Sequence, residues 1–209
     1  METRLSAIVQ SLKERYPQPR CALHYTTDYE LMIAVRLSAQ CTDARVNLVT
    51  PALFAKYPTL DAFADADLGD VEELVHSCGF YKHKARDIIL ACQMLRREYG
   101  GKVPDTMDEL LKLPGVGRKT ANLLLGDLYG QPSVVCDTHV IRISNRLGLA
   151  QGKDPEKVET QLRSILPPEE STAFCHRIVL FGRDLCTARS PRCDCCPMRP
   201  LCKEFTGNL

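Results

Sequence analysis

The sequence predicts an all-α fold, and three observations support this prediction. Apolar residues recur at the spacing of one helix face, as at Leu5, Ile8, Val9 and Leu12. Residues that favour helix caps, and prolines that stop helices, lie at the edges of such segments. Only the short run 133–135 has an extended pattern. A set of closely connected helices is therefore expected.

The expected helices follow one another from the first residues onward. Residues 1–4 lead into the first helix, which Pro17 and Pro19 end. Further helical patterns cover residues 29–40, 42–57, 70–78, 83–99, 106–112, 118–129, 138–147, 155–166 and 169–182.

Cap chemistry supports several of these boundaries. Thr106 with Glu109 fits a capping box, in which each side chain binds the backbone N–H of the other residue. Asp154 followed by Pro155 fits an N-cap and the first position of a helix. The double proline at 167–168 stops the helix that precedes it.

Length and composition are those of an ordinary globular chain. Its 209 residues, of which 44% are hydrophobic and 25% charged, suit one compact domain or two small ones. The formal net charge of +1 predicts no strong global attraction to polyanions, so a nucleic-acid surface would be a local basic patch. No segment approaches the run of about 18 apolar residues that spans a membrane, and no signal peptide is apparent, so a soluble, intracellular protein is expected.

After Cys186 the helical periodicity gives way to a segment rich in cysteine, proline and arginine. Cys186, Cys193, Cys196 and Cys202 have the spacing C-x6-C-x2-C-x5-C. Four thiolates in one short loop suit a [4Fe-4S] cluster or a structural Zn²⁺, because both take tetrahedrally arranged sulfur ligands. Cys195 breaks this count and is expected not to be a ligand. A pair of disulfides is the alternative, which the odd total of eleven cysteines and the lack of an export signal disfavour.

The same segment carries four basic residues, Arg189, Arg192, Arg199 and Lys203, against two acidic ones. A basic loop that a cluster holds rigid could contact the DNA backbone without a high overall charge. A solvated basic surface explains the same residues equally well.

A glycine-rich turn, LPGVGRKT at residues 113–120, joins two of the expected helices. Pro114 ends the first helix, while Gly115 and Gly117 permit positive φ and close approach of a ligand to the backbone. Unpaired N–H groups at the start of the next helix would complete an anion site suited to a DNA phosphate. The spacing is not that of a P-loop. An ordinary turn between two antiparallel helices is the alternative.

Lys119 lies in the first turn of the helix that follows, where the helix dipole disfavours a cation. Partial desolvation there would increase the fraction of neutral amine, which is the form that attacks an electrophilic carbon. From position alone, a lysine at the surface or on a phosphate is the commoner explanation.

Several segments together form a recognisable series. LPGVGRKTAN at 113–122 is followed by VVCDTHVIRISNRLGL at 134–149 and then by the four-cysteine spacing, and they are preceded by MIAVRLSAQCTD at 32–43 and GFYKHKA at 79–85. In this order they resemble the endonuclease III family of helix-hairpin-helix DNA glycosylases with AP-lyase activity. The resemblance covers the chain almost from end to end.

The resemblance implies two helical domains with a DNA-binding cleft between them. One is residues 22–132 with the helix-hairpin-helix motif, and the other is residues 1–21 plus 133–209. The second domain would hold a [4Fe-4S] cluster on Cys186, Cys193, Cys196 and Cys202, which makes zinc the less favoured metal. The implied partner is double-stranded DNA containing damaged bases or abasic sites, bound by a monomeric, cytoplasmic protein associated with the nucleoid.

The resemblance also implies roles for single residues. Lys119 is the nucleophile and Asp137 the catalytic carboxylate, although an aspartate there could simply cap the next helix. Gln40 reaches into the DNA near the flipped nucleotide, with a buried amide at a helix end as the alternative. Phe80 matches a residue that wedges into the duplex. The remaining implied DNA contacts are those of the turn: Leu113, Gly115, Val116, Gly117 and Arg118.

In the implied reaction the enzyme removes oxidised pyrimidines by first flipping the damaged nucleotide out of the duplex. Lys119 attacks the sugar C1′, the base departs, and the ring opens to a Schiff base. β-Elimination then cuts the strand on the 3′ side. Asp137 either helps to keep Lys119 deprotonated or stabilises positive charge on the sugar.

Two other functions remain open from the sequence. One is a related glycosylase for mispaired adenine or alkylated bases. The adenine enzymes usually lack a lysine at the position of Lys119 and continue into a further domain, whereas this sequence ends seven residues after Cys202. The other is a non-catalytic DNA-binding module with a structural or redox-sensing cluster, which would bind duplex DNA without forming an imine.

Overall fold

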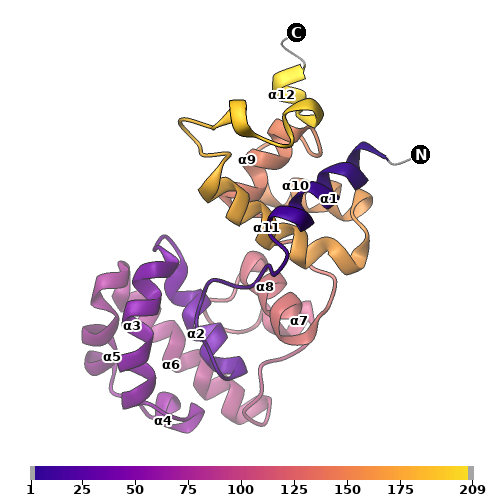
Figure 1. Ribbon diagram of the computed structural model, residues 1–209. Helices are drawn as coiled ribbons and strands as arrows, with labels where there is room; N and C mark the ends of the chain where they lie inside the picture. The colour runs from indigo at the N-terminus through magenta and orange to yellow at the C-terminus, as the bar shows by residue number, and fades with distance from the viewer. Residues whose placement is uncertain (1–2, 207–209) are drawn as a thin grey trace. The chain divides into compact units, whose positions relative to one another are not determined.

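The structure, a computed structural model, describes residues 3–206, and the chain divides into two compact units (Figure 1). The hairpin unit is Cys21–Tyr129, and the tail unit combines Met1–Arg20 with Gly130–Leu209. The lead into the first predicted helix at residues 1 and 2 lies outside the described residues.

The hairpin unit is a group of helices around one apolar core. Its helices are α2 (Asp28–Ser38), α3 (Asp43–Lys56), α4 (Leu60–Ala64), α5 (Leu68–Val75), η1 (His76–Cys78), α6 (Tyr81–Glu98), α7 (Met107–Leu110) and α8 (Arg118–Tyr129). The long helix α6 packs against α4 and α5, and α2 packs against α3, α6 and α8. Leu31, Ile33, Phe63 and Leu95 are fully buried between them. This core fixes the loops that connect the helices.

The tail unit is built around α9 (Thr138–Leu147) and α11 (Ser171–Asp184), and it also contains α1 (Arg4–Arg15), α10 (Pro155–Ile165), η2 (Pro168–Glu170), η3 (Cys193–Cys195), η4 (Arg199–Leu201) and α12 (Lys203–Thr206). Helix α11 packs against both α1 and α9. Gly182 allows its close approach to α9, since a Cβ there would come within 2.8 Å of Ile143 Cδ1. Helix α9 in turn supports α12 (Figure 1).

The all-α prediction is confirmed, because the part of the chain from 3 to 206 contains helices and turns but no strand. The run 133–135 is buried without forming a strand. The sequence pattern did not predict α4, nor the three short helices η3, η4 and α12 of the cysteine segment. None of the described helices is long and apolar enough to cross a membrane.

The predicted capping box at Thr106 is only half right. The Thr106 hydroxyl accepts from the Glu109 N–H at 3.4 Å, as expected. The Glu109 carboxylate instead accepts from the Tyr99 hydroxyl at 2.6 Å and from Lys112 Nζ at 2.7 Å. These two bonds have replaced the second half of the capping box, and the one from Tyr99 fastens α7 to the end of α6.

Candidate functional site

The turn between α7 and α8 is anchored in the core of the hairpin unit. Leu113 and Val116 are buried, and the Val116 N–H donates to the Leu113 carbonyl at 3.1 Å. Gly115 and Gly117 are exposed beside these anchors. Helix α8 follows at once, because the Ala121 N–H donates to the Gly117 carbonyl at 2.9 Å. The turn therefore presents backbone to solvent from a rigid base.

Exposure divides the predicted DNA contacts of the turn into two kinds. Leu113 and Val116 turn their side chains into the core, so only their backbone could meet a ligand. Arg118 and Lys119 are exposed in the first turn of α8, where N–H groups have no acceptor within the helix. Lys119 is exposed in the free protein, as the surface alternative for this lysine describes.

Gly115 lets the turn lie directly against an ion pair. Its φ is +77°, and a Cβ there would come 2.5 Å from Arg36 Nε and 2.9 Å from Asp87 Cβ. Arg36 cannot move away cheaply, because its Nη2 and Nε donate to Asp87 Oδ2 at 2.6 and 2.8 Å. Glycine is thus required at this position for both its backbone conformation and its lack of a side chain.

We expect Gly115→Ala to lower the free energy of unfolding by about 2 kcal/mol or more, from left-handed strain and from displacement of Arg36. Gly117→Ala is the matched control, because nothing lies within 4 Å of a Cβ at Gly117 and its φ is not positive. That variant should stay within about 0.5 kcal/mol of the parent protein. Urea unfolding of the three proteins measures the difference. Equal stability of the two variants would contradict the packing described for Gly115.

Asp137 is the N-cap of α9, as one of the two sequence interpretations proposed. Its Oδ1 accepts from the Val140 N–H at 2.8 Å. The cap bond fixes the direction of this carboxylate. Capping occupies one oxygen and leaves Oδ2 without a partner among residues 3–206. Asp137 can therefore cap α9 and still offer an oxygen to a ligand.

Gln40 and Phe80 share an uncommon backbone conformation. Their φ values are +53° and +48°, and within residues 3–206 no other non-glycine residue lies in the left-handed region. Such strain persists where the surroundings enforce it, and it is frequent at functional sites. Gln40 is exposed just beyond α2, so a buried amide is the wrong description, and Phe80 is 64% exposed at the start of α6.

A buried lysine that sequence reasoning missed binds the two segments carrying Gln40 and Phe80. Lys84 of α6 is only 1% exposed. Its Nζ donates to the carbonyls of Leu37 and Cys78, both at 2.8 Å. Burial lowers the pKa of Lys84. The signal in the sequence is a lysine on the apolar face of α6.

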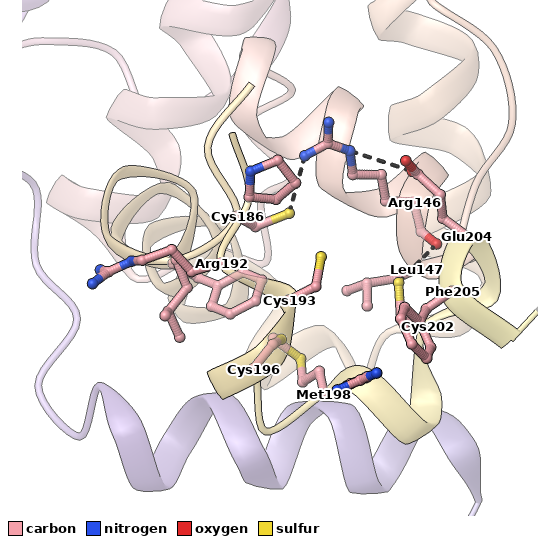
Figure 2. Close-up of a pocket in the computed structure, with 14 residues that line it drawn as sticks. Arg146, Leu147, Cys186, Arg192, Cys193, Cys196, Met198, Cys202, Glu204 and Phe205 are labelled. Carbon is pink, nitrogen blue, oxygen red and sulfur yellow. Dashed lines mark hydrogen bonds and ion pairs between the residues drawn. The ribbon is translucent and has the colours of Figure 1, made fainter. Parts of the chain in front are cut away.

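Residues 186–206 form the tail segment, which contains five cysteines. Four of them line one pocket of about 200 Å³ (Figure 2): Cys186, Cys193, Cys196 and Cys202. Burial is the main cause that raises the pKa of the Cys196 thiol, and the neighbouring thiols of the other three add to it. Cys195 is exposed outside this group, and its thiol donates to the Arg192 carbonyl at 3.6 Å.

Arg146 of α9 fastens this pocket to the tail unit. Its Nη1 donates to Cys186 Sγ at 3.3 Å and to the Thr187 carbonyl at 2.8 Å. Its Nε pairs with Glu204 at 3.3 Å, and its carbonyl accepts from the Cys202 thiol at 3.4 Å (Figure 2). One arginine therefore contacts both ends of the cysteine segment.

The donor set of the pocket suits a cluster better than a single ion. A tetrahedral Zn²⁺ holds its sulfurs about 2.3 Å from one point, leaving no cavity among them. A cavity of about 200 Å³ lined by four thiols accommodates a larger inorganic group, and [4Fe-4S] takes four cysteine ligands. Six apolar residues and four charged ones complete the lining: Leu147, Phe181, Leu185, Pro191, Met198 and Phe205, with Arg146, Arg192, Arg199 and Glu204. Across residues 3–206, no three His, Cys, Asp or Glu side chains are gathered closely enough for one ion.

Half of the predicted basic patch is held by partners within the protein. Arg192 Nη2 pairs with Asp184 Oδ1 at 2.6 Å. The Arg199 guanidinium lies 4.2 Å from the centre of the Phe205 ring. Arg189 and Lys203 are exposed. The charges of this segment therefore contribute partly to its own packing.

The structure groups the predicted residues by unit. Lys119, the turn, Gln40 and Phe80 belong to the hairpin unit, whereas Asp137 and the four pocket cysteines belong to the tail unit.

Comparisons with a protein-family model, with related sequences and with solved structures all point to base excision DNA repair proteins. Residues 33–168 match the model of a family described as HhH-GPD superfamily base excision DNA repair protein. Endonuclease III of Synechocystis sp. (strain ATCC 27184 / PCC 6803 / Kazusa) is 46% identical over 200 residues, which are 95% of this chain and 91% of that protein. A solved non-covalent endonuclease III–DNA complex matches with a TM-score of 0.92 at 43% identity, covering 100% of this chain and 99% of that one. A trapped endonuclease III–DNA covalent intermediate matches with a TM-score of 0.91, the same identity and the same coverage.

Proposed function

Because the chain belongs to the endonuclease III family of the HhH-GPD superfamily of base excision DNA repair proteins, we propose that it is a bifunctional DNA glycosylase and AP lyase. Its substrate is duplex DNA that contains oxidised pyrimidines or abasic sites. One observation carries the proposal: an exposed lysine, Lys119, stands in the first turn of α8 beside a glycine turn anchored in the core.

Lys119 is the proposed nucleophile, and its setting suits that role. The amine attacks C1′ of the flipped nucleotide, the glycosidic bond breaks, and the base leaves with the bonding electrons and takes up a proton. The sugar then opens to a protonated imine on Lys119. Loss of a C2′ proton expels the 3′ phosphate, which cuts the strand, and water releases the lysine. The glycines and N–H groups of residues 115–119 hold a phosphate so that the sugar reaches the amine.

Asp137 is the proposed catalytic carboxylate. The cap bond from Val140 fixes its Oδ1, so Oδ2 has a defined direction. The carboxylate can accept a proton from the Lys119 ammonium, which frees the amine for attack, or it can stabilise positive charge that develops on the sugar. The capping and catalytic interpretations are therefore compatible.

Gln40 and Phe80 are the proposed probes of the duplex. Flipping a nucleotide costs a few kcal/mol of stacking and pairing, and an apolar side chain that enters the vacated space offsets part of this cost. Phe80 is exposed, as such a wedge requires, and its backbone is held in the left-handed region. Gln40 offers an amide donor and acceptor to the bases.

Cys186, Cys193, Cys196 and Cys202 are the proposed ligands of a [4Fe-4S] cluster. When bound, the cluster cross-links a segment that has little apolar core of its own. The N–H of Arg146 that binds Cys186 Sγ stabilises negative charge on that sulfur. The cluster thus orders the segment that carries Arg189 and Lys203.

A single cleavage assay tests the proposed function. The protein is incubated with a duplex carrying one thymine glycol, with EDTA present to suppress hydrolytic nucleases. The expected products are the free base and a strand ending in a 3′ unsaturated aldehyde, with the undamaged duplex left intact. Base release without strand cleavage would indicate a monofunctional glycosylase, and binding without either product would indicate a binding module.

We expect Asp137→Asn to separate catalysis from capping. Asparagine caps helices about as well as aspartate, so the free energy of unfolding should change by less than about 0.5 kcal/mol. Base excision should fall by roughly 100-fold, because the amide can neither accept the proton nor carry the charge. Single-turnover rates and urea unfolding measure the two effects. An Asn variant as active as the parent protein would leave Asp137 with the cap alone.

A further inference from the structure

Two helix ends direct their last carbonyls at one buried ammonium group. Leu37 belongs to the final turn of α2, and Cys78 is the last residue of η1. The final carbonyl oxygens of a helix receive no hydrogen bond from its own N–H groups, and the helix dipole places partial negative charge on them. Lys84 Nζ supplies a donor to each carbonyl at 2.8 Å from a site that is 1% exposed.

Each of these carbonyls lies just before one of the two strained residues. Leu37 precedes Gln40 by three residues, and Cys78 precedes Phe80 by two. The backbone N–H of Lys84 also donates to the Phe80 carbonyl at 3.1 Å. The same residue thus holds the Phe80 segment at two points and the Gln40 segment at one.

A buried lysine is a costly way to join two loops. Its charge is desolvated, and burial lowers its pKa. An apolar side chain would fill the same space on the face of α6 without that cost, but it would leave two buried carbonyls without a donor. The lysine fixes two separate backbone segments relative to one atom.

We propose that Lys84 is a positioning residue that sets Gln40 and Phe80 in register for entry into the duplex. This proposal rests on the proposed function for its consequence in DNA, although its structural part does not. Lys84 does not touch DNA or the reacting atoms. It acts on the step in which the damaged nucleotide leaves the stack, and it leaves the chemistry at Lys119 unchanged.

A fluorescence experiment tests the structural part without DNA. The chain contains no tryptophan, so Phe80→Trp and Gln40→Trp each give a single reporter. Adding Lys84→Met should lower the residual time-resolved anisotropy of both reporters, since both segments lose their anchor. Lys82→Met, at an exposed lysine in the first turn of the same helix, removes a charge without a buried bond and should lower neither. Loosening of one reporter only, or of neither, would overturn the proposal.

A kinetic comparison tests the functional part. Lys84→Met should slow excision of thymine glycol from duplex DNA by roughly 100-fold, the scale of loss from a small misplacement of interacting groups. Cleavage of an abasic site in single-stranded DNA needs no unstacking, so it should change by less than about threefold. An equal loss on both substrates would indicate general damage to the fold and overturn the proposal, as would no loss on either.

Two safeguards keep these results interpretable. Circular dichroism and thermal unfolding establish that each variant is folded. If Lys84→Met is not, Lys84→Gln keeps N–H donors on a shorter side chain and should show the same difference between substrates with a smaller loss. If the parent protein cleaves neither substrate, the proposed function fails, while the anisotropy experiment still decides whether Lys84 couples the two segments.

Discussion

Replacing Lys119 with alanine is expected to abolish covalent catalysis. Strand cleavage at thymine glycol and at abasic sites should both fall by roughly 1,000-fold or more, because no other group replaces a lost nucleophile. Lys119 is exposed, so the free energy of unfolding should change by less than about 0.5 kcal/mol. Duplex affinity should change far less than the rate. Single-turnover cleavage with a parallel binding titration measures these quantities.

Lys112→Ala is the matched control for this variant. Lys112 stands before the same turn and pairs with Glu109 at 2.7 Å, on an exposed surface. Lys112→Ala removes one positive charge from the hairpin unit, as Lys119→Ala does. It should leave the cleavage rate within about threefold of the parent protein. Strand cleavage that survived in Lys119→Ala would show that the nucleophile is a different residue.

Replacing Cys202 with serine is expected to have the second large effect. A hydroxyl is a poor ligand for iron, so the variant should lose the cluster and with it the order of the tail segment. The free energy of unfolding should fall by about 3 kcal/mol or more, since the segment has little core of its own. Iron and sulfide analysis, visible absorbance and urea unfolding measure the loss.

Cys195→Ser provides the discriminating comparison. Cys195 is one residue from Cys196 in the chain, but its thiol lies outside the pocket and bonds the Arg192 carbonyl. This variant should retain four iron atoms per chain and the stability of the parent protein. Loss of iron from Cys195→Ser, or a single zinc ion in the parent protein, would contradict the ligand set inferred from spacing and pocket lining.

The parts of the fold that could be predicted are those that local rules determine. Helices α8 and α9 occupy the predicted ranges 118–129 and 138–147, because apolar periodicity and caps act within a few residues. Helix α4 was not predicted because its five residues, Leu60–Ala64, are too few to show a helical period. The capping box at Thr106 was half wrong because the Glu109 carboxylate binds Tyr99, ten residues earlier, and Lys112 instead of the Thr106 N–H.

In the candidate site, too, local patterns could be predicted and contacts between residues far apart in the sequence could not. The turn and Lys119 stand out as a short local pattern, and their roles came from resemblance. The support of the turn by Arg36 and Asp87 joins residues 51 positions apart, and no local pattern indicates it. Lys84 was visible only as a lysine on an apolar helix face. Its two acceptors are backbone carbonyls, which the sequence does not distinguish.

The most direct test of the central claim identifies the residue that becomes bonded to DNA. The protein is reduced with borohydride while acting on a thymine glycol duplex, and the adduct is digested and mapped by mass spectrometry. The expected result is one cross-linked peptide with the deoxyribose remnant on Lys119, and no adduct with the undamaged duplex. An adduct on another lysine, or no adduct under conditions in which the protein binds and cleaves the duplex, would contradict a Schiff-base mechanism at Lys119.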